Sequence, residues 1–122
     1  QYNFCYQMSK KYDFELVCDI RDINKQIDLV FASEYFEHIQ NPVEHLLDII
    51  KKCNPKYFLI ANTFNQRAIG HFDNYYHNDE KHDGKSISRL FNKTLRNNNY
   101  TKVKTNLWNQ RPNYWKKHEQ FF

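Results

Sequence analysis

The strongest constraint on the fold is a pair of short apolar runs separated by one amphipathic segment. The runs are DLVFAS (residues 28–33) and YFLIAN (residues 57–62), and their nearly continuous apolar character is typical of strands covered on both faces. Between them, Asn41 and Pro42 form the pattern of an N-cap followed by proline in the first helical turn, and Pro55 ends the apolar periodicity. This strand–helix–strand order predicts two neighbouring parallel strands in an α/β sheet.

Three further segments complete the predicted order of elements. FELVCDI (residues 14–20) is short, apolar and bounded by polar residues, so it is predicted to be a strand. Apolar residues at helical spacing from Ile87 to Leu95 predict a second helix, which ends near residues 97–99, where asparagines tolerate the left-handed conformation. TKVKTNLW (residues 101–108) alternates polar and apolar side chains, which favours an antiparallel strand at the sheet edge. The chain is therefore predicted to form an α/β sheet that is mostly parallel.

Polar, ionisable side chains follow the first apolar run without a gap. DLVFAS passes directly into Glu34, Glu37 and His38, spaced E-x-x-E-H. In α/β sheets, ligands bind just beyond the carboxyl ends of the parallel strands, so these side chains are predicted to face a common pocket. They are candidates for a general base or for metal ligands. The structural alternative is that Glu37 and His38 cap or brace the helix that begins at Pro42.

A long polar and aromatic loop (residues 63–85) follows the second apolar run. Loops of this length in small domains are more often functional than structural. Because the loop follows a strand, it is predicted to lie over the same sheet edge, as a wall or lid for the substrate. Its aromatic and histidine side chains are His71, Phe72, Tyr75, Tyr76 and His77. The alternative is an ordered surface loop anchored by its aromatic residues.

Composition narrows the class of protein. The 122 residues suffice for one small domain with a single core, and 40% hydrophobic with 26% charged residues is a globular rather than a disordered balance. No apolar run approaches the roughly 20 residues of a membrane-spanning helix, so no membrane partner is predicted. Three cysteines without C-x-x-C spacing (Cys5, Cys18 and Cys53) predict reduced, buried thiols in a cytoplasmic protein.

Positive charge is concentrated in the second half of the chain. Residues 1–60 carry seven basic and nine acidic side chains, whereas residues 61–122 carry eleven basic and five acidic ones. A basic, aromatic-rich C-terminal region is a candidate contact surface for nucleic acid. The residues concerned are Trp108, Arg111, Tyr114, Trp115, Lys116 and Lys117. The alternative is a solvated basic face, with the aromatic side chains packing the chain end onto the domain.

Residues 28–42, DLVFASEYFEHIQNP, resemble the class I S-adenosylmethionine-dependent methyltransferases. In that family a comparable strand is followed by E-x-x-E-H, a short gap and a proline that begins a helix. The preceding VCDIRDI is similar to the segment whose acidic residue contacts the adenine of the cofactor, and NPKYFLIANTF resembles the next strand. HDGKSISRLFNKTLRNNNYTKV resembles the late helix and the strand after it, so the resemblance spans about residues 14–108.

The resemblance implies a Rossmann-like methyltransferase sheet that is incomplete at its N-terminus, because the Gly-rich cofactor loop of the family has no counterpart in this sequence. Residues 1–122 would then be a single domain, the C-terminal portion of such a methyltransferase. The implied activity is methyl transfer from S-adenosylmethionine to an unidentified acceptor. The implied cofactor-binding residues are Asp19, Ile20, Ala32 and Glu34, and the implied catalytic residues are Glu37 and His38.

Two alternative functions share this predicted fold. Small-RNA 2′-O-methyltransferases look like the same family but place a divalent metal ion at E-x-x-E-H and a later histidine. In this chain the metal set would be Glu34, Glu37, His38 and a later histidine, His82 or His77, although the metal-independent interpretation is preferred. The other alternative is a nucleic-acid-binding or scaffold protein without catalytic activity.

Overall fold

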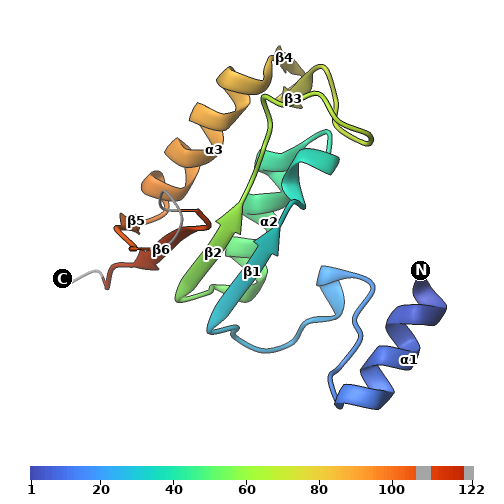
Figure 1. Cartoon of the computed structure of the whole chain (residues 1–122). Helices are drawn as coiled ribbons and strands as arrows, with labels where there is room; N and C mark the ends of the chain where they lie inside the picture. The colour runs from blue at the N-terminus through green and yellow to red at the C-terminus, as the bar shows by residue number, and fades with distance from the viewer. Residues whose placement is uncertain (107–110, 120–122) are drawn as a thin grey trace.

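The computed structural model describes residues 1–106 and 111–119 and contains a four-stranded sheet (Figure 1). The strand order across this sheet is β1-β2-β6-β5. β1 and β2 are parallel, and β6 is antiparallel to both of its neighbours. The strands are β1 (Leu29–Ser33), β2 (Tyr57–Ala61), β5 (Tyr100–Val103) and β6 (Asn113–Lys117).

Helices, short 3₁₀ segments and a small hairpin complete the described structure. The helices are α1 (Tyr2–Tyr12), α2 (Pro42–Cys53) and α3 (Gly84–Asn97). The 3₁₀ segments are η1 (Ile20–Asp22) and η2 (Phe36–His38), and the hairpin consists of β3 (Tyr75–His77) and β4 (Glu80–His82). α2 and α3 contact each other beside the sheet, whereas α1 stands apart from them (Figure 1).

The predicted strand–helix–strand unit is confirmed. β1 and β2 pair in parallel along their whole length. α2 begins at Pro42, and after its last residue Asn54 adopts the left-handed conformation (φ 42°), although the side chain of Asn41 makes no capping hydrogen bond. α3 confirms the second predicted helix, and beyond its end Asn99 is also left-handed (φ 72°).

The predicted Rossmann-like, mostly parallel sheet is wrong. Of the three strand pairs in the described sheet, only β1–β2 is parallel. The difference is due to β6, which the sequence pattern does not predict: its residues, NYWKK, insert between β2 and β5 and run antiparallel to both. β5 (Tyr100–Val103) confirms the predicted antiparallel edge strand over residues 101–103. Residues 104–106 of that prediction form no strand, and residues 107–108 lie outside the described residues.

The strand predicted over residues 14–20 is also wrong. This segment forms no strand, and Phe14 and Val17 are exposed. Apolar composition alone does not make a strand, since each strand needs a neighbour that pairs with its backbone N–H and C=O groups. The chain instead turns into η1, where the Asp19 carboxylate accepts a hydrogen bond from the backbone N–H of Arg21 (2.9 Å).

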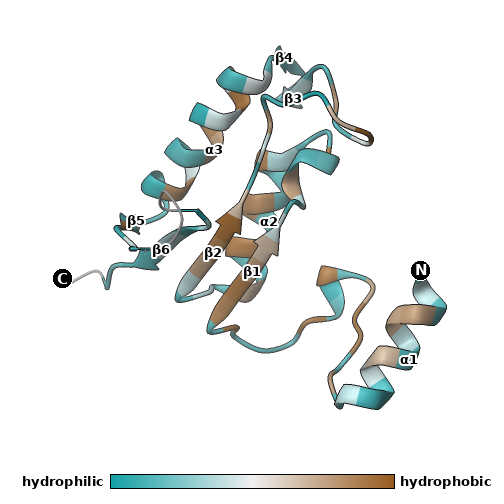
Figure 2. Ribbon diagram, viewed as in Figure 1, coloured by the Kyte–Doolittle hydropathy of each residue, from teal (hydrophilic) through white to brown (hydrophobic). Residues whose placement is uncertain are grey.

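One face of the sheet is covered and the other is open. Along β1, Val30 and Ala32 pack against the core, whereas Leu29 is exposed and Phe31 is 64% exposed. The prediction that this strand is covered on both faces is therefore wrong, because α2 and α3 pack against the same side of the sheet. Figure 2 shows β1 and β2 as hydrophobic strands, and the exposed Leu29 and Phe31 make the open face of β1 apolar.

The core lies between the covered face of the sheet and the helices α2 and α3. Its largest side chain is Trp115, 1% exposed, which β6 places opposite Phe58 of β2. The rings of Phe36 and Phe91 meet edge to face, with centroids 4.8 Å apart, and join η2 to α3. Trp115 therefore packs the end of the chain onto the domain, as the structural alternative for the C-terminal aromatics predicts; Trp108 lies outside the described residues.

The predicted loop over residues 63–85 contains the hairpin β3–β4. Its two-residue turn, Asn78-Asp79, has positive φ at both positions (49° and 62°), which these two side chains tolerate. The segment returns to α3 at Gly84, where an added Cβ would lie 2.4 Å from the carbonyl oxygen of Phe64. Only glycine permits this close approach, so Gly84 holds the end of the loop against its start.

The predictions from composition are tested in part. Within the ranges that the structure describes, no helix has the length and apolar character needed to cross a bilayer. The three cysteines are free, as predicted, but only Cys53 is buried. Cys5 on α1 and Cys18 before η1 are exposed, because both lie outside the sheet and its covering helices.

Stability is predicted to fall at alkaline pH because Tyr100 is buried. Its hydroxyl donates a hydrogen bond to the carbonyl oxygen of Pro55 (2.5 Å), and burial raises the pKa of Tyr100 from 10.0 to about 12. The folded state keeps this proton while the unfolded state releases it, so the stabilisation is complete below about pH 10 and is lost as the pH rises toward 12. The complete loss amounts to roughly 2–3 kcal/mol, of which about 1.4 kcal/mol should be lost between about pH 8 and 11, as measured by urea denaturation.

Tyr100→Phe is the matched variant, because it keeps the ring and removes the ionisable group. We expect it to be less stable than the parent protein by about 1 kcal/mol at neutral pH, through the lost hydrogen bond. Above about pH 10 its stability should decline less steeply. Equal slopes for the two proteins would contradict the role assigned to Tyr100.

Candidate functional site

The parallel pairing of β1 and β2 brings the segments that follow them to one edge of the sheet. Ser33 lies opposite Ala61 at the strand ends, and the backbone N–H of Glu34 donates a hydrogen bond to the carbonyl oxygen of Ala61 (2.8 Å). Thr63, which follows β2, therefore lies beside Glu34. With three neighbours these two residues form the strand-end cluster, which consists of Glu34, Glu37, His38, Thr63 and His71.

Glu34 has an unusual backbone conformation. Its φ is 50°, in the left-handed region. The other non-glycine residues with positive φ among the described residues are asparagine or aspartate, whose short polar side chains tolerate this region. Backbone strain of this kind persists only where the surroundings hold it, and it is concentrated at functional sites. The strained turn directs the chain from β1 toward η2.

The hydroxyl of Thr63 lies between two carboxylates. Its Oγ1 is 2.8 Å from Oε2 of Glu34 and 2.8 Å from Oε1 of Glu37. The backbone N–H of Thr63 donates to the same oxygen of Glu37 (3.2 Å). A hydroxyl has a single proton to donate, so it serves one carboxylate at a time. The two carboxylates therefore compete for one donor, and they repel each other when both are charged.

Glu37 is completely buried, with 0% of its surface exposed. Its second carboxylate oxygen, Oε2, has no hydrogen-bond partner among the described residues. The backbone at this position is held by the Tyr75 hydroxyl, which donates to the carbonyl oxygen of Glu37 (2.9 Å). Burial of a charged oxygen without a partner is costly. The fold thus fixes a buried acceptor for which the described part of the chain supplies no donor.

His38 and His71 are oriented by backbone carbonyl groups. Nδ1 of His38 lies 2.9 Å from the carbonyl oxygen of Gly70, and Nδ1 of His71 lies 2.9 Å from the carbonyl oxygen of Gln66. A carbonyl oxygen only accepts hydrogen bonds, so both Nδ1 atoms donate. Nε2 of each neutral ring therefore carries a free lone pair. The two rings meet edge to face, with centroids 4.8 Å apart.

Gly70 makes the contact with His38 possible. Its φ is 81°, and an added Cβ would lie 2.8 Å from Nδ1 of His38. A residue with a side chain would combine a strained backbone with this collision. The loop after β2 therefore reaches the strand end at a glycine, and His71 follows directly.

Arg111 brings positive charge to the same edge of the sheet. Its guanidinium lies 3.6 Å from Oε1 of Glu34 and donates a hydrogen bond to the carbonyl oxygen of Asn62 (3.2 Å). The neighbouring Glu37 carboxyl and the Thr63 hydroxyl, with a smaller contribution from Arg111, hold the pKa of Glu34 below its ordinary value. Glu34 is therefore ionised at neutral pH.

The residues that the resemblance assigns to cofactor binding have different environments. Glu34 belongs to the strand-end cluster, whereas Ala32 is buried in the core and Ile20 packs against the same core. Asp19 forms a bidentate pair with Arg21, whose Nη2 lies 2.6 Å from Oδ2. These hydrogen bonds lower the pKa of the Asp19 carboxyl to about 2. The oxygens of Asp19 thus accept hydrogen bonds from Arg21 in an exposed pair, and its contact with adenine stays a prediction.

Glu37 and His38, the predicted catalytic residues, lie together with a histidine from the loop. The ligand atoms of Glu37, His38 and His71 all lie within 4.8 Å of one another. The side-chain hydrogen bonds of Glu37 run to Thr63, and that of His38 runs to Gly70. Neither side chain caps the first turn of α2, so these contacts do not support the helix-capping interpretation.

The two later histidines of the predicted metal set have partners elsewhere. Nδ1 of His82 lies 2.8 Å from the Ser86 hydroxyl, at the start of α3. Nδ1 of His77 lies 2.7 Å from Oε1 of Glu44, on α2. The structure therefore brings neither of them, but His71, to the predicted pair of Glu37 and His38.

Thr63 and His71 are the members of the cluster that sequence reasoning does not assign. Thr63 has a usable signal, because it follows β2 at the same edge at which Glu34 follows β1. His71 lies in the loop that is predicted to cover this edge. Residue spacing gives no sign of which histidine in that loop reaches the cluster, since the path of the loop depends on the close approach of Gly70 to His38.

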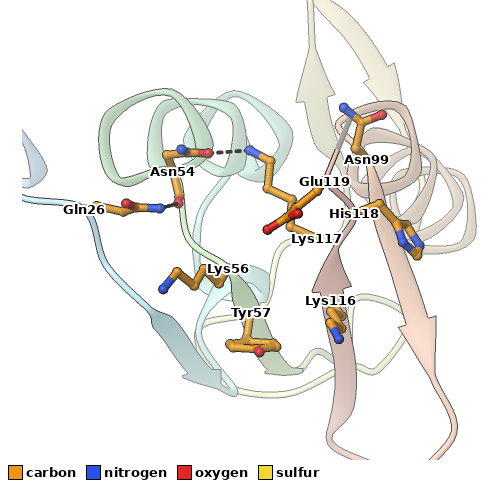
Figure 3. A pocket seen from close by; sticks show the side chains of 9 residues that line it. All are labelled: Gln26, Asn54, Lys56, Tyr57, Asn99, Lys116, Lys117, His118 and Glu119. Atoms are coloured by element: carbon orange, nitrogen blue, oxygen red, sulfur yellow. Dashed lines mark hydrogen bonds between the residues drawn. The ribbon is translucent and has the colours of Figure 1, made fainter. Parts of the chain in front are cut away.

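A hollow lined by basic residues lies at the end of the sheet opposite to the strand-end cluster (Figure 3). It measures about 850 Å³ and lies where α2 ends, β2 begins and β6 ends. Lys56, Lys116 and Lys117 bring positive charge to it. Lys56 pairs with Asp28 (3.1 Å), and Nζ of Lys117 contacts the side chain of Asn54. Part of the predicted basic C-terminal region therefore lines a hollow.

Comparison with known proteins adds no assignment. No family model, no curated protein and no solved structure matches the chain. The resemblance to methyltransferases therefore depends on the sequence segments that carry it.

The strained turn predicts an unusual effect of replacing Glu34. Glu34→Gly removes the cost of a left-handed glutamate, so we expect the free energy of unfolding to stay unchanged or to rise by up to about 1 kcal/mol. Ser33→Gly is the matched control, because Ser33 lies in the extended backbone of β1, where glycine should lower stability by about 0.5–1 kcal/mol. Urea denaturation measures both. A loss for Glu34→Gly as large as that for Ser33→Gly would refute the strain.

Proposed function

We propose that the protein takes part in methyl transfer from S-adenosylmethionine. In this proposal the strand-end cluster binds the amino-acid end of the cofactor and the methyl acceptor. One observation supports it above all: E-x-x-E-H leaves β1 through a left-handed turn at Glu34 and carries Glu37 and His38 to the carboxyl edge of a parallel strand pair. Ligands of α/β proteins bind at such edges. The resemblance of this same segment to methyltransferases suggests the reaction.

Glu34 and Arg111 suit the two charges at the amino-acid end of the cofactor. S-adenosylmethionine carries an ammonium group and a carboxylate there. The Glu34 and Arg111 side chains are both 51% exposed, and their charged atoms lie 3.6 Å apart. A half-exposed pair of this kind gains little from its own contact in water, so it can exchange that contact for the two charges of a zwitterion. The exposed pair of Asp19 and Arg21 can exchange its contact in the same way, so Asp19 keeps its implied role at the adenine as a prediction.

His38 suits the role of general base toward the acceptor. S-adenosylmethionine supplies a methyl group on a positively charged sulfur, and the acceptor displaces that sulfur in line. An acceptor O–H or N–H group must also lose its proton. Because Nδ1 of His38 donates to Gly70, Nε2 is the basic atom of the ring, and the side chain is exposed. Glu37 and Thr63 hold the segment in place from its buried side.

Binding of the cofactor at the strand-end cluster is testable by NMR on the ¹⁵N-labelled chain. We expect S-adenosylmethionine to shift the backbone amide signals of Glu34 and Thr63 at millimolar concentration. A Kd of about 1 mM corresponds to roughly 4 kcal/mol, which suits contacts to one end of the ligand. Glu34→Gln should weaken binding about tenfold, because it removes a charge-assisted hydrogen bond.

Glu80→Gln is the matched control for this titration. Glu80 is an exposed carboxylate on β4, outside the strand-end cluster, and its replacement should leave the shifts and the affinity unchanged. Absence of shifts at Glu34 and Thr63 would contradict the assignment of this cluster to S-adenosylmethionine. Shifts confined to the basic hollow would contradict it equally.

A second candidate function is the binding of single-stranded nucleic acid at the basic hollow. The specific observation is that Lys56, Lys116 and Lys117 line one hollow next to the stacked rings of Tyr57 and Tyr114, whose centroids are 5.7 Å apart. Lysines neutralise phosphates, and aromatic faces stack with bases. This function belongs to a different class from catalysis and uses the other end of the sheet.

Salt dependence tests this second function. Three lysine–phosphate contacts predict a slope of about −2 when the logarithm of the binding constant is plotted against the logarithm of the salt concentration. Fluorescence anisotropy of a labelled oligonucleotide at about 50 to 200 mM salt measures the slope. Lys116→Gln should reduce it by about 0.7, whereas Lys93→Gln, at an exposed position of α3, should not change it. Equal slopes for the two variants, or no binding at low salt, would exclude this function.

A further inference from the structure

We infer that Glu37, His38 and His71 bind a divalent transition-metal ion of the zinc class. They offer one carboxylate oxygen and two imidazole nitrogens, which all lie within 4.8 Å of one another. Glu37 and His38 belong to η2, whereas His71 belongs to the loop after β2, so the ion would join two segments that are distant in the sequence. An ion needs only these three side chains, so the inference does not depend on methyl transfer. In the ion-bound protein Nε2 of His38 is a ligand and no longer serves as the general base.

The orientation of the two histidines is the first argument. A histidine that binds a metal through one ring nitrogen normally donates the other ring N–H to a backbone carbonyl or a carboxylate, which fixes the tautomer. His38 and His71 both have this arrangement, with Nδ1 donating to the carbonyl oxygens of Gly70 and Gln66 at 2.9 Å. Their Nε2 atoms are therefore the free ligand atoms. Two neighbouring histidine rings share this arrangement, whereas an ordinary surface histidine does not need it.

The buried oxygen of Glu37 is the second, independent argument. One oxygen of its carboxylate, Oε1, is held by the N–H and the hydroxyl of Thr63. The other, Oε2, is buried and has no partner in the described part of the chain. A cation supplies the interaction that this oxygen lacks and removes the cost of burying an unpaired charge. Thr63 then acts as the orienting neighbour of a metal ligand.

The combination of ligands narrows the identity of the ion. Mg²⁺ and Ca²⁺ prefer sites made of oxygen ligands, whereas Zn²⁺, Co²⁺ and related ions accept imidazole. Two histidines and one glutamate bind zinc with a fourth position left open. Ligand atoms that bind an ion at about 2.0–2.2 Å lie closer together than 4.8 Å, so the side chains must move inward. His38 is exposed and His71 is half-buried, so the core locks neither side chain in place.

The competing explanation for the buried carboxylate is a proton. Glu37 and Glu34 share the hydroxyl of Thr63, and a proton held by Glu37 would neutralise one of the two carboxylates without an ion. Such a proton leaves the matching orientation of the two histidine rings unexplained. It also predicts that a metal ion at this site would bind weakly or not at all, so a titration distinguishes the two explanations.

Metal binding is measured directly, without cofactor or acceptor. The chain, treated with chelator, is titrated with Zn²⁺ by calorimetry and with Co²⁺ by visible absorption. Both titrations use a Cys5→Ser, Cys18→Ser background, because these exposed thiols bind the same ions. We expect one ion per chain. His71→Ala should weaken binding by at least about tenfold, and Glu37→Gln should do the same.

His77→Ala and His82→Ala are the matched controls. Both histidines have partners outside the cluster, so their replacement should leave the affinity for Zn²⁺ unchanged. If circular dichroism shows that Glu37→Gln does not fold, the zinc affinity of His71→Ala alone tests the inference, because the side chain of His71 is only half-buried. Zinc binding weaker than about 100 μM would overturn the inference, as would equal affinities for His71→Ala and His77→Ala.

The outcomes for the metal and for methyl transfer are distinguishable. If the chain binds zinc but S-adenosylmethionine does not shift the amide signals of Glu34 and Thr63, methyl transfer is refuted and the metal site is supported. Shifts with S-adenosylmethionine in a chain that binds no zinc would refute the metal site alone.

Discussion

The structure depends on the parallel pairing of β1 and β2. α2 returns the chain so that the two strands start together, and the N–H of Tyr57 donates to the carbonyl oxygen of Asp28 (3.0 Å) at this start. Side chains alternate across a strand, so a slip of one residue would turn Ala32 out of the core and expose the whole inner face of β1. The register that packs the core therefore also fixes which residues leave the strands side by side. Glu34 and Thr63 are neighbours for this reason, and the chemistry of the strand-end cluster is a consequence of core packing.

β6 connects this core to both ends of the sheet. Its insertion between β2 and β5 buries Trp115 and makes the sheet mixed rather than mostly parallel. Because β6 runs opposite to β2, the residues before it lie at the strand-end edge, and Arg111 reaches Glu34 there. Its last residues, Lys116 and Lys117, lie at the other end and line the basic hollow. β6 and Arg111 before it thus bring positive charge to both ends of the sheet. The basic C-terminal region therefore contributes to the core through Trp115 as well as to the charged surface.

Features that depend on nearby residues could be predicted from the sequence, and features that depend on distant partners could not. The periodicity and the ends of α2 and α3 are local, and so is the passage from a buried strand into Glu34 and Glu37. β6 could not be predicted, because NYWKK has no clear apolar alternation and becomes a strand only between two partners far away in the sequence. Residues 14–20 show the opposite: their composition is typical of a strand, but no neighbouring strand in the described structure pairs with them. Which histidine of the loop reaches the strand-end cluster depends on the close approach of Gly70 to His38, and this is also a tertiary contact.

Three unusual features lie together at one edge of the sheet. Glu34 is left-handed, Glu37 is buried with one oxygen unpaired, and Gly70 must lack a side chain to leave room for His38. A strained residue of this kind costs about 1–3 kcal/mol, and an unpaired buried acceptor costs a similar amount. Elsewhere in the described chain the left-handed positions carry residues that tolerate them, so local preference and structure agree. Capping of α2 would require none of these costs. Asn41, at the capping position, makes no capping hydrogen bond with its side chain. A ligand bound at the strand-end cluster, as proposed, would account for the strained Glu34 and the unpaired oxygen of Glu37 together, whereas capping of α2 accounts for neither.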